Sequence, residues 1–441
     1  MNILLIVIDT LRADHLGCYG YPRTTTPQID ALAAQGTLFE QFIAPGIPTQ
    51  PSFTSLYTGV HPMTHRIVTH AGQMALSNGL PVLPELLARA GYTTCAVDNL
   101  YQMKPWFARG YEFYIDPSLR HTYPLSVTCD ELNARAIPWL HAHKGEKFFL
   151  LVHYWDPHTP YLPPRQYREL FYTGNPFDPD NSSLLPLRRQ FFGEMWQGWF
   201  NLFGSNLTDA EFIVALYDAE IRYVDDGVGA LLAALDASGM TEQTVVIVAA
   251  DHGECLGQHD IFFDHHGLYE DNIRCPLIVR WPGVVPAGRR IRTIVQHLDL
   301  APTLLDIAGV PIPSHVEGRS LLPLMTGATD RPYYDRVITE ECTWQAKWGL
   351  RTETHKFILS REPDLHGMPM RELYDLRTDP GECQNLADEQ PGLAAQFEQE
   401  LESWIAEWVS ALGYADDPIR EQGITLGKKW QEWLQQRNDE R

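Results

Sequence analysis

Carboxylate and imidazole side chains directly follow three apolar runs of this 441-residue chain. Carboxylates and imidazoles can accept and donate protons and can hold cations. A single aspartate at the end of a strand is commonly a turn or helix-capping residue. Three such ends in one chain instead favour a shared functional site. The side chains are Asp9 after residues 2–8, Asp156 and His158 after residues 148–155, and Asp251 and His252 after residues 244–250.

Short apolar runs predict the strands that would position these side chains. Most are apolar throughout rather than in alternation, which is typical of strands buried on both faces of a sheet covered by helices. The pattern therefore predicts an α/β sandwich, and in such sheets ligands bind where strands end and loops begin. The predicted strands are residues 2–8, 93–97, 148–155, 244–250 and 276–281, and residues 29–35 have the period of a helix.

The hydrophobic pattern changes near residue 331. Residues 1–330 predict one large α/β domain, and residues 331–441 predict a smaller α+β subdomain with a helical tail. Shorter strands are expected in the second part, at residues 337–339, 348–352 and 356–360.

An irregular, aromatic-rich insertion lies at about residues 166–206. We interpret its aromatic side chains first as packing against the body, with a lid or an oligomer contact as the alternatives. Trp430 and Trp433 are spaced three residues apart in a polar tail. They predict a helix that docks on the body or pairs with another subunit of a homo-oligomer.

The chain carries 34 Lys and Arg residues against 56 Asp and Glu residues, a formal net charge of -22. This charge repels polyanions, so no nucleic-acid polymer is expected as a partner, whereas a small anionic substrate can still bind in a local site. The first residues lack the basic segment and cleavage site of a signal peptide, and they are too few to span a bilayer. We expect a cytoplasmic protein that does not associate with membranes.

The segment from Thr49 to Gly59, Thr-Gln-Pro-Ser-Phe-Thr-Ser-Leu-Tyr-Thr-Gly, resembles the sulfatase signature C-x-P-S-R-x-x-L-x-T-G. It differs at two fixed positions, where Thr49 replaces Cys and Phe53 replaces Arg. Over most of its length the chain thus resembles the sulfatase branch of the alkaline-phosphatase superfamily. This resemblance implies an alkaline-phosphatase-like sandwich with a large, mixed, mostly parallel central sheet flanked by helices. Further sulfatase-like blocks lie in family order at residues 8–14, 156–161, 251–254, 297–309, 317–321 and 372–386.

The same resemblance implies a nucleophile at the N-terminus of a helix, in contact with a divalent metal ion. Position by position, it assigns the metal ligands to Asp9, Thr49, Asp251 and His252. Many relatives have a second Asp where this chain has Thr10, and an Asn where it has His252. Fewer carboxylates and one imidazole favour manganese or zinc, with calcium or magnesium as the alternatives.

Thr49 and Phe53 replace the two residues by which the sulfatase maturation machinery recognises its target. Without a thiol the catalytic formylglycine cannot form, so no formylglycine is expected and the Thr49 hydroxyl becomes the predicted nucleophile. Water can resolve a phosphothreonine, whereas a sulfothreonine lacks the elimination route of a geminal diol. The prediction is a metal-dependent hydrolase of phosphodiesters or phosphonate monoesters. The alternatives are a sulfatase that acts without formylglycine and a catalytically inactive binding protein.

The resemblance also places several residues near the substrate. His158 occupies the position of a substrate-facing His, and His265 that of a Lys, so each is expected to hold the anion or protonate the leaving oxygen. For His265, a second-metal ligand or a solvated loop residue are the alternatives. His266 is a further predicted substrate contact. Asn99 and Tyr101 stand where the family has G-K-W-H-L-G, and such neutral donors suit a singly charged ester.

Overall fold

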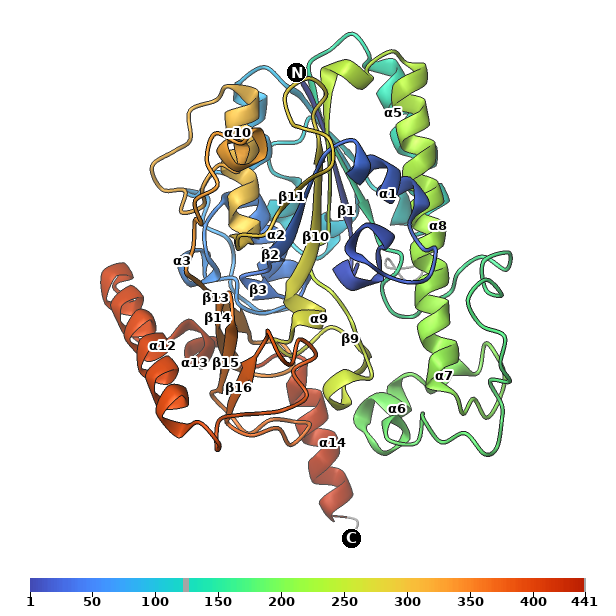
Figure 1. The fold of residues 1–441 in the computed structure, drawn as a ribbon, viewed down its shortest axis with the longest axis vertical. Helices are drawn as coiled ribbons and strands as arrows, with labels where there is room; N and C mark the ends of the chain where they lie inside the picture. Colours follow the sequence, from blue (N-terminus) through green and yellow to red (C-terminus); the bar gives the residue numbers. More distant parts are fainter. Residues whose placement is uncertain (122–126, 440–441) are drawn as a thin grey trace.

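The computed structural model describes residues 1–121 and 127–439, and within them the largest element is a nine-stranded sheet (Figure 1). The strand order is β11-β2-β10-β7-β1-β6-β4-β5, with β12 also paired to β2. Only β10 runs antiparallel to its neighbours in this sheet, so the predicted mixed, mostly parallel sheet is confirmed. The strands are β1 (Asn2–Ile8), β2 (Thr37–Ile43), β4 (Thr93–Val97), β5 (Phe113–Ile115), β6 (Phe148–Tyr154), β7 (Thr244–Ala249), β10 (Arg274–Arg280), β11 (Arg289–Ile291) and β12 (Val295–Gln296).

β1 lies in the middle of this sheet and is buried along its whole length. It pairs in parallel with β6 and β7, so that Ile3 lies between Phe149 and Val245. β1 and β4 have the predicted bounds, and β6, β7 and β10 differ from the prediction by one or two residues at their ends. β2 is not among the predicted strands, because Glu40 and Gln41 interrupt its apolar run.

Helices cover both faces of the large sheet (Figure 1). Apart from α2, which is buried throughout, they pack an apolar stripe against the body and leave polar side chains outside. The helix predicted at residues 29–35 begins two residues earlier, at Pro27, which is favoured in the first turn of a helix. The α/β sandwich is therefore confirmed. One face carries α1 (Pro27–Ala34), α5 (Cys129–Ala142) and α8 (Ala210–Ala237), and the other carries α2 (Thr49–Thr58), α4 (Leu83–Arg89) and α10 (Leu300–Ala308).

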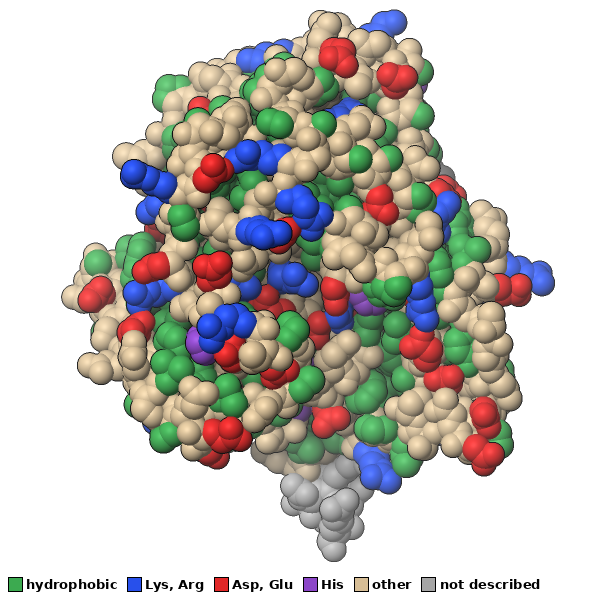
Figure 2. Space-filling view, in the orientation of Figure 1, with side chains coloured by type: hydrophobic (Ala, Val, Ile, Leu, Met, Phe, Trp, Pro, Cys, Tyr) green, Lys and Arg blue, Asp and Glu red, His purple; other side chains and the backbone are tan. Residues whose placement is uncertain are grey.

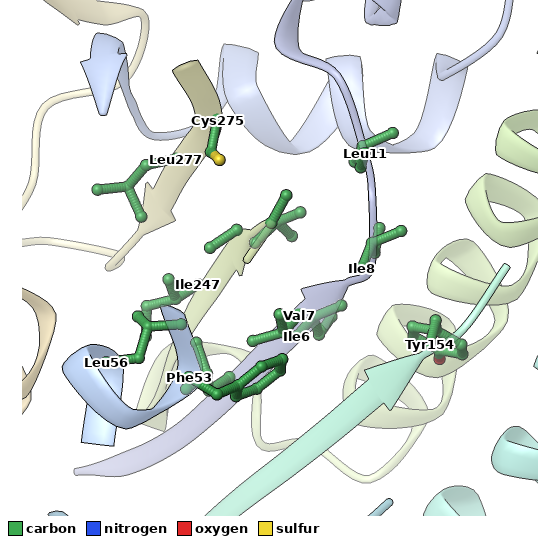
Figure 3. Packing of buried hydrophobic residues seen from close by; sticks show 14 of the residues in the cluster. Ile6, Val7, Ile8, Leu11, Phe53, Leu56, Tyr154, Ile247, Cys275 and Leu277 are labelled. Atoms are coloured by element: carbon green, nitrogen blue, oxygen red, sulfur yellow. The ribbon is translucent and has the colours of Figure 1, made fainter. Parts of the chain in front are cut away.

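Helix α2 is seated deep in the core, and all ten of its residues are buried. Phe53 and Leu56 of α2 lie near Ile6 and Val7 of β1 and near Ile247 of β7 (Figure 3). Complete burial of one such side chain contributes roughly 1.5–3 kcal/mol. The packing therefore holds the N-terminus of α2 in place relative to the ends of the strands.

A smaller five-stranded sheet lies beside the large one, in the order β16-β15-β14-β13-β3. Its four later strands are antiparallel to one another; the first three match the strands expected after residue 331, and the fourth, β16, was not predicted. β3 comes from the N-terminal part of the chain and pairs in parallel with β13. Helix α12 packs on this sheet. The elements are β3 (Gly46–Ile47), β13 (Arg336–Glu341), β14 (Lys347–Thr352), β15 (His355–Ser360), β16 (Arg371–Asp375) and α12 (Pro391–Leu412).

None of the helices in the described ranges has both the length and the apolarity needed to cross a membrane. The remaining helices and strands are mostly short. They are α3 (Pro62–His65), α6 (Phe191–Met195), α7 (Gln197–Phe200), α9 (Glu270–Ile273), α11 (Leu322–Thr326), α13 (Pro418–Gln422), α14 (Gly427–Asp439), β8 (Cys255–Leu256) and β9 (Phe262–Asp264).

The aromatic insertion and the C-terminal tail meet. Within the insertion, Phe192, Trp199 and Phe200 are buried against the body. Helix α14 packs on α6, where Trp430 stacks on Phe191 with 6.2 Å between ring centroids. The tail helix therefore docks on its own chain, which is one of the two predicted arrangements. On the face seen in Figure 2, acidic and basic side chains are interspersed.

Candidate active site

Thr49 is the first residue of α2, directly after β3 and Pro48. The first N–H groups of a helix have no partner within the helix and, with the helix dipole, favour an anion at that end. One turn later, the Ser52 hydroxyl donates a hydrogen bond of 2.6 Å to the backbone oxygen of Asp251. The buried helix thus holds Thr49 beside the loop that follows β7.

Asp9, Asp251 and His252 converge next to Thr49. Each offers one ligand atom, and these atoms all lie within 4.8 Å of one another. Asp9 follows β1 and Asp251 follows β7, and these two strands are parallel neighbours whose carboxyl ends lie side by side. All three side chains are fully buried. The structure therefore brings these three residues together, and Thr49, the fourth residue that the resemblance assigned to the metal, lies beside them.

His252 presents a lone pair to this cluster. Its Nδ1 lies 2.9 Å from the backbone oxygen of Gly253. A carbonyl oxygen can only accept a hydrogen bond, so Nδ1 carries the proton and Nε2 is free to act as a ligand. That Nε2 lies 3.2 Å from Thr49 Oγ, 3.4 Å from Asp251 Oδ2 and 3.7 Å from Asp9 Oδ1.

The donor set fits a divalent cation. Within the described part of the chain, Asp9 Oδ1 and Asp251 Oδ2 are buried and accept no hydrogen bond, which is costly unless a cation pairs with them. Burial first, and the charge of Asp9 second, raise the pKa of Asp251 to about 7. Ligand atoms about 2.0–2.2 Å from one ion lie about 3.0–3.6 Å apart. The separations around His252 Nε2 are close to this range.

A second layer of side chains lies behind Asp9, and the sequence analysis did not identify it. His153 of β6 is fully buried, with Nδ1 2.9 Å from Asp98 Oδ1 and Nε2 3.3 Å from Asp9 Oδ2. Burial lowers the pKa of His153, but its contacts with the two carboxylates outweigh burial and raise the pKa to about 10. Phe53 packs against the imidazole with 4.7 Å between ring centroids. The available signal was a histidine inside an otherwise apolar strand.

His158 and His265 face each other, with 4.8 Å between ring centroids, and the His265 ring lies equally close to His252. His158 Nδ1 donates to the backbone oxygen of Thr159 at 2.6 Å. His265 Nδ1 lies 3.5 Å from Glu254 Oε2. Burial lowers the pKa of both histidines, so both rings are neutral near pH 7. Their Nδ1 contacts orient the two rings beside the cluster.

The other three predicted substrate contacts, Asn99, Tyr101 and His266, each contact a neighbouring side chain of the protein. Asn99 is buried, and its Oδ1 accepts a hydrogen bond of 2.5 Å from Trp155 Nε1. Tyr101 is half exposed and packs on Tyr114. His266 Nε2 lies 2.7 Å from the Nε2 of His366, inside an aromatic cluster. These three side chains are therefore held by neighbouring protein groups and are not among the residues that line the cavity described next, so their contact with a substrate stays a prediction.

Asp156, which follows β6, and Arg12, which follows β1, bond to protein groups and have structural roles. Asp156 accepts a hydrogen bond of 2.9 Å from the backbone N–H of Cys129, at the start of α5. Arg12 is buried and forms ion pairs with Asp14 and Asp271 at 2.7 and 2.5 Å. Asp156 therefore contacts the first residue of α5, whose N-cap residue is Thr128.

A cavity of about 400 Å³ opens beside Thr49. Its wall includes His158, His265 and Asp264, together with His70, which the sequence did not single out. This volume is within the usual range of small-molecule sites, which is roughly 300–1,000 Å³. The Thr49 hydroxyl and two neutral imidazoles therefore line one small-molecule cavity, and the buried cation ligands lie behind Thr49, an arrangement suited to hydrolysis of an anionic ester.

Known proteins share this fold and sequence pattern. The sulfatase family model matches residues 1–310, and a model of the C-terminal part of N-sulphoglucosamine sulphohydrolase matches residues 257–407. N-acetylglucosamine-6-O-sulfatase of Bacteroides thetaiotaomicron is 22% identical over 87% of this chain and 82% of its own length. The multifunctional alkaline phosphatase superfamily protein PehA of Trinickia caryophylli is 25% identical, with coverages of 91% and 95%. The structure of the phosphonate monoester hydrolase of Agrobacterium radiobacter superposes with a TM-score of 0.72 at 23% identity, with coverages of 92% and 96%.

Proposed function

This chain belongs to the sulfatase family of the alkaline-phosphatase superfamily, and we propose that it hydrolyses phosphodiesters or phosphonate monoesters with the Thr49 hydroxyl as nucleophile. The observation that carries the proposal is the position of Thr49. Its Oγ lies 3.2 Å from His252 Nε2, at the start of a helix and on the wall of the cavity. A hydroxyl there is next to cation ligands and at the helix end that attracts anions.

Asp9, Asp251 and His252 would hold a divalent metal ion, with Thr49 Oγ as a further ligand. Two carboxylates and one imidazole suit manganese or zinc better than calcium. When bound, such an ion lowers the pKa of the nucleophile and neutralises negative charge in the transition state.

The residues of the chain supply the remaining chemistry. Thr49 Oγ forms a bond to phosphorus while the bond from phosphorus to the leaving oxygen breaks. The proton released by Thr49 balances the proton gained by the leaving oxygen, and the neutral imidazoles of His158 and His265 can carry it. The N–H groups at the start of α2 stabilise the phosphoryl oxygens. Water then hydrolyses the phosphothreonine and restores the Thr49 hydroxyl.

Phosphorus is proposed over sulfur because Thr49 has a single hydroxyl. A phosphothreonine is open to attack by water at phosphorus, whereas a sulfothreonine has no second hydroxyl on the same carbon to expel sulfate. The sulfatase names of relatives such as N-acetylglucosamine-6-O-sulfatase favour a second candidate, which is sulfate-ester hydrolysis without formylglycine. A third candidate is a binding protein that holds the metal and the anion without turnover.

The test is a comparison of substrates and of variants at position 49. Protein loaded with manganese should hydrolyse bis(4-nitrophenyl) phosphate faster than 4-nitrophenyl sulfate. Thr49→Ala should lower kcat by at least about 10³-fold, whereas Thr49→Ser keeps a hydroxyl and should retain measurable activity. Thr58→Ala, at the other end of the same buried helix, controls for damage to α2.

Each alternative predicts a different result in this comparison. Undiminished hydrolysis by Thr49→Ala would exclude Thr49 as the nucleophile. A higher rate on the sulfate ester than on the phosphodiester would favour the second candidate. Metal binding without turnover of either ester would favour the binding protein.

A further inference from the structure

Segments that lie far apart in the sequence wall the cavity beside Thr49. Phe191 and Trp196 come from the aromatic insertion, Trp344 comes from the connection between β13 and β14, and Lys429 comes from α14. Because these side chains share one cavity with Thr49, a substrate whose reacting group contacts Thr49 extends its remaining part among them. The wall therefore contacts the part of the substrate that lies beyond the reacting group.

Helix α14 is fixed in this wall by aromatic contacts with the insertion. Trp430 is 2% exposed and stacks on Phe191. Trp433 Nε1 donates a hydrogen bond of 2.8 Å to Glu194 Oε2. In Figure 1, α14 and α6 lie at the same end of the molecule, and their residues are in contact. These contacts hold the α14 side of the cavity wall in a fixed position.

The start of α14 also approaches the Trp344 segment very closely. The Gly427 N–H donates a hydrogen bond of 3.0 Å to the backbone oxygen of Thr343. A Cβ at position 427 would lie only 2.2 Å from the backbone oxygen of Trp344, so this approach requires glycine. The close approach holds Leu426 and Lys429 in the wall.

The chemistry of the wall points to a flat apolar ligand. The aromatic rings of Phe191, Trp196 and Trp344 offer faces for stacking. Met103 and Met195 also line the cavity, and methionine side chains adapt to aromatic ligands. An aromatic leaving group fits this part of the wall better than a heavily hydroxylated one, because Phe191, Trp196 and Trp344 offer ring faces for stacking.

Lys429 adds a charge to this surface. In the described part of the chain it is the one Lys or Arg that lines the cavity, and it forms no ion pair there. Asp264 also lines the cavity, but its Oδ1 is engaged by the backbone N–H of His265 and by His266 Nδ1, so the Lys429 ammonium favours a ligand that carries a negative group. We propose that the cavity is a leaving-group site for aromatic groups with an anionic substituent, an inference that rests on the proposed ester hydrolysis at Thr49.

Calorimetric titration of the manganese-loaded protein with leaving-group fragments tests this site independently of turnover. The fragments are 4-hydroxyphenylacetate, its neutral amide, and trans-4-hydroxycyclohexylacetate, which keeps the charge but loses the flat ring. The aromatic acid should bind about two- to fivefold more tightly than its amide. It should bind about two- to tenfold more tightly than the cyclohexyl acid. Equal affinities for the three fragments would overturn the proposal.

Variants identify the groups responsible. Lys429→Met should reduce the preference for the acid over the amide to about one, whereas Lys428→Met, an exposed neighbour, should leave it unchanged. Trp344→Leu should remove the preference for the aromatic ring. Because Trp344 is buried and its variant could fail to fold, Trp196→Leu at a partly exposed position provides the same test. Preferences that survive in the Lys429 and Trp196 variants would overturn the proposal.

The outcomes separate this inference from the proposed function. If the fragments bind with the expected preferences but no phosphodiester or phosphonate monoester is hydrolysed, the site stands as a ligand site and the proposed reaction is wrong. If these esters are hydrolysed but KM for aryl esters does not change in the Lys429 and Trp196 variants, the reaction stands and the leaving-group site is wrong.

Discussion

Acid should weaken the contact between α3 and the small sheet, because a buried neutral histidine joins them. His61 Nδ1 accepts a hydrogen bond of 3.1 Å from the backbone N–H of Met63. Its Nε2–H donates to the backbone oxygen of Ile338 in β13, at 3.0 Å. Only the contact with Met63 requires the neutral ring, and burial lowers the pKa of His61 to about 4 although the hydrogen bond to Ile338 acts in the opposite direction. Protonation would leave the Met63 N–H without its acceptor.

The size of the effect follows from the difference between the folded and unfolded pKa values of His61, about 4 and 6.5. Between these values the unfolded chain binds more protons than the folded protein, so the free energy of unfolding falls as the pH drops from 6.5 to 4. One pKa unit corresponds to about 1.4 kcal/mol. The expected loss is about 2 kcal/mol between pH 7 and pH 5 and about 3 kcal/mol between pH 7 and pH 4.

Urea unfolding at pH 7 and pH 5, followed by tryptophan fluorescence, measures this loss in the wild type and in His61→Asn. Asparagine keeps an acceptor for the Met63 N–H but does not titrate. The wild type should lose about 2 kcal/mol more than the variant between the two pH values. Other buried histidines, such as His297, are present in both proteins and cancel in the difference. Equal losses in the two proteins would refute the reasoning.

Three further predictions follow from buried contacts. Asp251→Asn should weaken manganese binding by more than about 100-fold in equilibrium dialysis. Mutating a residue that only supports a metal ligand already lowers metal affinity about 10- to 100-fold, and Asp251 is expected to be a ligand itself. Unchanged affinity would place the metal elsewhere. Gly427→Val should speed hydrogen exchange in α14 and destabilise the protein by about 1–3 kcal/mol, since the new Cβ would meet a backbone oxygen at 2.2 Å; exchange at the wild-type rate would contradict this. Lys347→Met should cost about 3–5 kcal/mol in urea unfolding, because Asp364 and Glu372 would remain buried without their cation; a cost below about 1 kcal/mol would show that the pairs are weak.

Much of the large sheet could be predicted from the sequence, because strands buried on both faces must be apolar throughout. β1 and β4 were located at their observed bounds for this reason. β2 was missed because its polar side chains at Glu40 and Gln41 interrupt the pattern. Pairing between distant segments cannot be predicted from such patterns. The parallel pair of β3 and β13, which joins the start of α2 to the small sheet, is therefore visible only in the structure.

For the site, too, local sequence patterns predicted some residues, and others could be identified only from contacts between distant segments. Asp9, Asp251 and His252 end or follow apolar runs, so their types and positions pointed to a shared cluster before its geometry was known. His153 lies inside an apolar run, and nothing local distinguishes it from a core histidine. Its role depends on Asp98, which reaches it from a neighbouring strand end.

Motif position was a weaker guide for the residues expected to contact the substrate. Asn99, Tyr101 and His266 were selected by their place in family blocks, but a side chain's direction depends on its nearest partners. His70 and Trp344 line the cavity although no block pointed to them. Such walls form from loops, whose course depends on contacts that are distant in sequence.

The sequence by itself determined the α/β sandwich, the family and the residues available to hold a metal ion, because strand periodicity and local motifs are written in neighbouring residues. Only the tertiary structure decided that Thr49 lies 3.2 Å from His252 Nε2 and that the insertion and α14 close one cavity around it. Those contacts join segments up to several hundred residues apart. They depend on packing in three dimensions, which no local pattern specifies.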